Sequence, residues 1–301
     1  MFACWRRLYN HAVISTVRVA LSILIVSTAS VSLPRTASAQ TGSSRAVLVT
    51  ATDAGNRPLA NLGEDDFVVR EAGEPREVFA VHLADYPLVL LLDNGDGAGD
   101  FESVRQAAAR FIARIGRDRP VAIAALADPA AMITTFDDDR ATVMAAIAGL
   151  KPGGPSGAGF LQAIAKAAAM IRATQAPFSA VVVISATDPN TRSEAPVELV
   201  APIIDSRTAV HVIARTPAAS ARGAVGTLGD TLRLISDQTR GQFTAIYSAA
   251  SYAPALDRLA DRLSAEMMVE FIEPPGAVPS DDVKVGVRVP GAQVRGLGVS
   301  R

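Results

Sequence analysis

An apolar run that ends in a loop of aspartates and glycines is the first feature of this sequence that could do chemistry. Residues 88–100 read LVLLLDNGDGAGD, which spaces Asp93, Asp96 and Asp100 among glycines. A further carboxylate, Asp188, follows the apolar run in SAVVVISATD. Carboxylate oxygens are the ligands that Ca²⁺ and Mg²⁺ prefer in proteins. Asp93, Asp96 and Asp188 are therefore candidate metal ligands; the alternative is a solvated acidic loop, because Asp and Gly are also ordinary turn residues.

Alternating strands and helices must position this loop. Between residues 87 and 273, apolar runs occur at PLVLLLD, PVAIAAL, AVVVIS, AVHVIA and MMVEFI. Runs that are apolar on both sides suit a parallel sheet covered by helices on each face. The segments between them have helical periodicity, as in residues 101–115, and Gly241 is expected at the C′ position of the helix in TLRLISDQTRG. The pattern predicts a doubly wound α/β domain.

Two β-rich segments flank this domain. Residues 40–86 read as strands around turns at AGNRP and EAGEP, and residues 274–301 read as two short strands around a Pro-Gly turn. Apolar strands at both ends need partners, and the termini of one domain often lie close together. We therefore expect the two segments to join into a small β module, as a single sheet.

The first 39 residues have the features of a secretory signal. An Arg6-Arg7 pair precedes the apolar stretch VALSILIV, and the small-residue triplet at 37–39 predicts cleavage after Ala39. The single cysteine, Cys4, lies in this segment, so the exported chain would use no disulfide and no thiol chemistry. With 29 basic and 30 acidic residues and no basic stripe, the chain is not expected to bind nucleic acid, or to insert in a membrane after cleavage.

The order of these elements resembles the von Willebrand factor A domain of secreted bacterial proteins. The resemblance covers nearly all of residues 45–299 and lies in VTATDAGNRPLANLGEDDFVVREAGEPREVFAV, PLVLLLDNGDG and SAVVVISATD. It implies a six-stranded, mostly parallel sheet and a protein ligand. It also implies a magnesium-type site at the carboxyl edge of the sheet, built from an Asp-x-Ser-x-Ser run, a Thr and a second Asp.

Most of these ligand positions hold other residues here. Asp93 matches the first Asp, but the two Ser positions are Gly95 and Gly97. The Thr position is Ala158, with Ser156 two residues earlier, and the second Asp position is Ala186, with Asp188 two residues later. A single carboxylate cannot outcompete the hydration shell of Mg²⁺. The resemblance thus implies a degenerate site.

We therefore expect an exported, non-enzymatic protein-binding domain in the periplasm or outside the cell, with no cofactor. Its binding edge would include Asn94, Gly95, Gly97, Ser156, Ala158 and Ala186. One alternative is metal-dependent adhesion through a rebuilt acidic site holding Ca²⁺ or Mg²⁺. Another is a hydrolase using His82 or His211, although both lie in strand-like runs and no local motif supports a catalytic triad.

Overall fold

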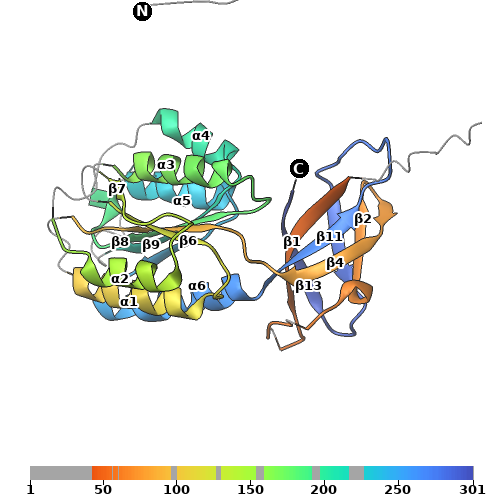
Figure 1. Cartoon of the computed structure of the whole chain (residues 1–301), viewed down its shortest axis with the longest axis horizontal. Coiled ribbons are helices and arrows are strands. Elements are labelled where there is room, and N and C mark those ends of the chain that lie inside the picture. Colours follow the sequence, from red (N-terminus) through yellow and green to blue (C-terminus); the bar gives the residue numbers. More distant parts are fainter. Residues whose placement is uncertain are drawn as a thin grey trace, which may run out of the picture. The chain divides into compact units, whose positions relative to one another are not determined.

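A computed structural model describes residues 43–55, 57–59, 61–95, 100–126, 130–153, 159–191, 197–216 and 227–300 (Figure 1). Thr41 begins the compact unit to which all of these residues belong. The predicted signal and its cleavage point lie outside the described residues, as do Asp96, Gly97, Ser156 and Ala158. Within the described ranges, no helix has the length and hydropathy needed to cross a membrane.

A six-stranded sheet forms the centre of the α/β domain. Its order is β10-β9-β8-β5-β6-β7, and every neighbouring pair is parallel except β6 with β7. The strands are β5 (Leu88–Leu92), β6 (Val121–Ala125), β7 (Ala131–Met132), β8 (Ala180–Ser185), β9 (Ala209–Arg215) and β10 (Phe243–Ile246). This arrangement confirms the predicted doubly wound, mostly parallel sheet.

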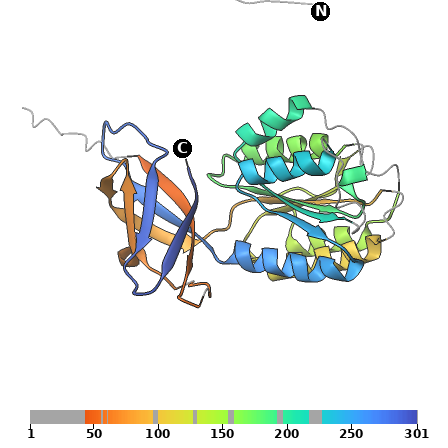
Figure 2. The ribbon, with the colours of Figure 1, turned by 180° about the vertical axis from the view of Figure 1, so that it is seen from behind.

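Helices cover both faces of this sheet, which explains why β5, β6 and β8 are buried at every position (Figures 1 and 2). One face packs against α1 (Phe101–Arg114), α2 (Arg140–Gly149) and α6 (Tyr252–Ser264). The other packs against α3 (Phe160–Ala173), α4 (Val200–Asp205) and α5 (Leu228–Gln238). Short 3₁₀ turns are η1 (Glu64–Asp66), η2 (Pro189–Thr191), η3 (Val197–Leu199) and η4 (Ala249–Ser251).

The end of α5 differs from the prediction. Arg240, and not Gly241, adopts the left-handed conformation after the helix, with φ of 61°. Gly241 is required for another reason, because a Cβ there would lie 1.9 Å from the carbonyl oxygen of Val210. The glycine therefore permits a close approach between the end of α5 and β9, while an arginine takes the turn.

The flanking segments pair with each other, as predicted, but they form two sheets and not one. The first sheet has the order β13-β1-β11-β4 and the second has the order β12-β2-β3. Apolar side chains from both sheets form a separate core that includes Val49, Phe67 and Phe271. The strands are β1 (Ser44–Thr52), β2 (Phe67–Glu71), β3 (Glu74–Arg76), β4 (Val78–Leu83), β11 (Glu266–Ile272), β12 (Val283–Val287) and β13 (Gln293–Val299).

One strand belongs to a different sheet from the one predicted. The run MMVEFI was expected in the parallel sheet, but it forms β11, which pairs antiparallel with β1 and β4 in the β module. Burial on both faces made β11 look like a parallel core strand, because periodicity alone cannot say which sheet covers it. The edge position of the parallel sheet is taken by β10.

Candidate functional site

The carboxyl ends of β5 and β8 lie side by side at the point where the strand order reverses. From β5 the chain continues to β6 on one side, and later to β8 and β9 on the other. Leu92 pairs with Ile184 at the ends of the two strands. In doubly wound folds, ligands bind in the crevice outside such a switch point. The structure brings Asp93 and Ala186 together at this position.

The carboxylate of Asp93 is fully buried and accepts hydrogen bonds from Gly95, Ala186 and Thr187. Its Oδ2 accepts the backbone N–H of Ala186 at 3.1 Å, the N–H of Thr187 at 3.2 Å and the hydroxyl of Thr187 at 2.9 Å. Its Oδ1 accepts the N–H of Gly95 at 3.3 Å. Asp93 thus joins the end of β5 to the turn after β8.

Among the described residues, the surroundings of Asp93 do not supply the ligands of a magnesium ion. Mg²⁺ needs six oxygens in near-octahedral geometry, whereas the atoms around Asp93 Oδ2 are N–H and O–H donors whose hydrogens point at the carboxylate. Gly95 supplies no side-chain oxygen, and Ala186 supplies a methyl group and a backbone donor. A cation at Oδ2 would have to displace three donors that already neutralise the carboxylate.

The other acidic residues of this edge also have protein partners. Asp100 Oδ2 lies 2.7 Å from Arg215 Nε, and both side chains are about a quarter exposed. Asp188 Oδ1 accepts the backbone N–H of Asn190 at 3.0 Å and its side-chain N–H at 2.8 Å. Across the described part of the chain, no three His, Cys, Asp or Glu side chains are grouped to hold a metal ion.

Two of the predicted edge residues are buried supports for the loops. Asn94 donates from Nδ2 to the carbonyl of Lys151 at 3.1 Å, and its own carbonyl accepts the N–H of Gly153 at 2.9 Å. Ala186 is buried against the domain core and contributes its backbone N–H to Asp93. These residues fix the relative positions of three loops, so a partner would meet neighbouring side chains.

The sequence analysis did not predict three residues of this edge, which are Tyr252, Tyr247 and Val197. Tyr252, at the start of α6, is buried and donates its hydroxyl to the carbonyl of Ser185 at 2.8 Å. Burial raises the pKa of Tyr252, and the nearby Asp100 adds to the rise. Tyr247 follows β10 with 60% of its surface exposed, and Val197 is 78% exposed. The signal for Tyr247 is an aromatic residue directly after an apolar strand.

The two histidines show no hydrolase arrangement. Partial burial lowers the pKa of His82, but the contact of its Nε2 with Glu270 at 3.0 Å, its bond to the carbonyl of Leu83 and the charges of Glu270 and Asp85 together outweigh burial, so the pKa is raised. His211, in β9, is 2% exposed; burial and the nearby Arg262 lower its pKa to about 3. Among the described residues, neither imidazole is hydrogen-bonded to a serine.

Comparison with known proteins finds similarity in fold. No family model matches the sequence, and no curated protein matches it. A von Willebrand factor type A protein from Catenulispora acidiphila matches with 14% identity and a TM-score of 0.48, over 87% of this chain and 74% of that chain. BatB from Bacteroides thetaiotaomicron matches with 16% identity and a TM-score of 0.45, over 59% of this chain and 97% of that chain.

A third similar structure is proximal thread matrix protein 1 from the mussel byssus, with 13% identity and a TM-score of 0.45, over 62% of this chain and 49% of that chain. The assignment of the fold stands on the strand order and directions of the sheet itself. This chain carries a doubly wound α/β domain with a mostly parallel six-stranded sheet, and a separate antiparallel β module.

Proposed function

We propose that this chain is an exported, non-enzymatic binding protein, whose α/β domain meets a protein partner at the carboxyl edge of the six-stranded sheet without a bridging metal. The observation that carries the proposal is the set of four protein donors on Asp93. This carboxylate is the one metal-ligand position kept by the sequence, and its oxygens hold the turn after β8. Recognition would then rely on shape and direct polar contacts.

The edge offers suitable contact residues. Loops at the carboxyl ends of parallel strands carry binding in many folds, while the sheet beneath keeps them in place. Tyr247 and Val197 expose apolar surface after β10 and after the turn that follows β8. Tyrosine is enriched among residues that dominate binding energy at protein interfaces. Tyr247 is therefore the contact residue that we select for the test.

Capture of a partner from the periplasm and the culture medium tests the proposal. The exported protein should retain its partner when EDTA is added, and Tyr247→Ala should lose most of the partner. Phe79→Ala is the matched control, because Phe79 is also an exposed aromatic residue but lies in β4 of the β module. Loss of the partner in EDTA, or equal loss in both variants, would contradict the proposal.

The second candidate function is metal-dependent adhesion through a rebuilt acidic site. It is favoured by the number of carboxylates near this edge, since Asp93, Asp100 and Asp188 all follow the ends of strands or precede α1. Ca²⁺ accepts six to eight oxygens in irregular geometry, so it would be the better guest of such a site. In that case EDTA would release the partner and added Ca²⁺ would restore it.

A further inference from the structure

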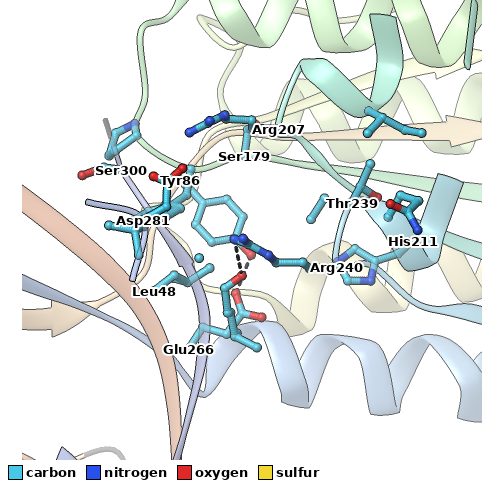
Figure 3. A pocket seen from close by; sticks show the side chains of 18 of the residues that line it. Leu48, Tyr86, Ser179, Arg207, His211, Thr239, Arg240, Glu266, Asp281 and Ser300 are labelled. Atoms are coloured by element: carbon cyan, nitrogen blue, oxygen red, sulfur yellow. Dashed lines mark hydrogen bonds between the residues drawn. The ribbon is translucent and has the colours of Figure 1, made fainter. Parts of the chain in front are cut away.

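A pocket lies at the amino edge of the six-stranded sheet, opposite the edge that the proposed function uses. It has a volume of about 290 Å³ and lies at the amino ends of β8, β9 and β10, where strand β13 of the β module approaches (Figure 3). We infer that this pocket binds a small organic carboxylate, through the guanidinium groups of Arg207, Arg240 and Arg262. Such a volume is near the lower limit for small-molecule sites.

The three arginines line the pocket with donors that remain available. Arg240 donates from Nη1 to the carbonyl of Leu297 at 3.0 Å, and Arg262 donates from Nη1 to the side-chain oxygen of Gln242 at 3.1 Å. Within the described ranges, none of Arg207, Arg240 and Arg262 forms an ion pair. A guanidinium has five donors, so each arginine keeps donors for a ligand. Their forked geometry suits the two oxygens of a carboxylate.

The acidic residues of the pocket are already engaged. Glu266 accepts the hydroxyl of Tyr86 at 2.5 Å, and Arg119 stacks 4.2 Å from the centre of the Tyr86 ring. Burial raises the pKa of Glu266, which weakens its repulsion of an incoming anion. Asp281 lies 3.8 Å from the guanidinium of Arg45 in the β module. The arginines thus give the pocket a surplus of positive charge.

A buried imidazole adds a polar group to the same wall. His211 lines the pocket and is 2% exposed, and its Nδ1 has no hydrogen-bond partner within the described part of the chain. A buried polar atom without a partner costs free energy, so a ligand that reaches Nδ1 would recover that cost. The unsatisfied atom is a second observation that points to a ligand here.

The rest of the lining selects an organic anion. Leu48, Phe178, Ile204 and Leu297 supply apolar surface that can pack against a hydrocarbon body. Inorganic phosphate has no such body and would leave the apolar part of the lining without a contact. Gly298 leaves room for the guanidinium of Arg240, because a Cβ there would lie 2.6 Å from Nη1 of Arg240.

Isothermal titration of the purified exported protein with benzoate, succinate and inorganic phosphate tests the inference. Benzoate or succinate should bind at one site. Arg240→Gln and Arg262→Gln should each weaken that binding by about tenfold, which corresponds to the loss of one charge-assisted contact. Arg258→Gln is the matched control, since Arg258 is exposed one turn before Arg262 on α6 and does not line the pocket.

The outcomes are separable from those of the partner experiment. All three variants should keep the partner capture of the parent protein, because the pocket lies at the other end of the sheet, and circular dichroism should show that each remains folded. Binding of phosphate alone would overturn the carboxylate assignment. Absence of heat from both carboxylates, or equal weakening in Arg258→Gln and Arg262→Gln, would overturn the site.

Discussion

The two ends of the six-stranded sheet treat charge in opposite ways. At the carboxyl edge, Asp93 is surrounded by backbone and hydroxyl donors, and Asp100 is paired with Arg215. At the amino edge, Arg240 and Arg262 donate to neutral oxygens and form no ion pair within the described residues, while the charge of Arg262 also acts on Glu266. The carboxylates at the carboxyl edge are thus held by protein donors, while the guanidinium groups at the amino edge keep donors for a ligand.

On the two proposals above, the fold does not decide which end of a sheet binds a charged ligand. The switch point between β5 and β8 is the usual ligand position in doubly wound domains, yet here its carboxylate serves as a link between two strands. The opposite end gains a pocket because the β module supplies a second wall through Leu297 and Gly298. Function therefore has to be argued from the residues of each site.

The largest effect is expected from removal of the Asp93 carboxylate. Asp93→Ala would leave the buried N–H groups of Gly95 and Ala186, and the N–H and hydroxyl of Thr187, without this acceptor. Unsatisfied buried donors cost about 1–3 kcal/mol each, so we expect the free energy of unfolding to fall by at least about 4 kcal/mol. Urea denaturation measures this change.

Asp93→Asn is the control for this prediction. The amide oxygen of asparagine can still accept the three bonds now made to Oδ2, so the loss should be about 1 kcal/mol. If Asp93→Ala were as stable as the parent protein, the carboxylate would not be the link that joins β5 to the turn after β8.

An intermediate effect is expected from Glu266 at the amino edge. Its pKa is raised above the ordinary value of 4.5 by burial, while the hydrogen bond from Tyr86 and the charges of Arg119 and Arg262 oppose the rise. A raised pKa in the folded state means that the stabilising contribution is fully present below pH 4.5 and is lost as the pH rises through the folded-state pKa.

Glu266→Gln should therefore gain stability relative to the parent protein as the pH increases from 4.5 to neutrality. The gain would be about 1.4 kcal/mol for each unit by which folding raises the pKa. Thermal unfolding of both proteins across this pH range gives the comparison. A stability difference that stays constant with pH would show that Glu266 titrates normally.

The smallest effect is expected from the ion pair at the carboxyl edge. Arg215 and Asp100 are partly exposed, so Arg215→Gln should cost about 0.5–1 kcal/mol. The cost should shrink in 1 M salt, where screening acts over about 3 Å. A cost that does not change with salt would mean that Arg215 contributes by packing and not by charge.

The sequence predicts the sheet and its helices because apolar runs and helical stripes reflect burial directly. It also identifies Asp93 as the residue that ends the first parallel strand. It does not predict the donors on Asp93, because the N–H groups of Ala186 and Thr187 come from a turn more than ninety residues away, whose backbone direction leaves no compositional trace.

The sequence does not predict the pocket at the amino edge either, because its lining residues come from distant parts of the chain. Arg207, Arg240 and Arg262 follow or lie within three different helices, and each looks like an ordinary surface arginine in the sequence. The sheet to which β11 belongs could not be predicted for the same reason. Its apolar run records burial, but pairing with β1 depends on contacts more than two hundred residues apart.

Titration calorimetry of Ca²⁺ and Mg²⁺ into the purified exported protein tests the central claim most directly. If the donors from Gly95, Ala186 and Thr187 occupy the carboxylate of Asp93, neither ion should produce heat beyond that of dilution. Binding of either ion at one site, with the heat lost in the folded Asp93→Asn variant, would contradict the account and restore a metal to the carboxyl edge.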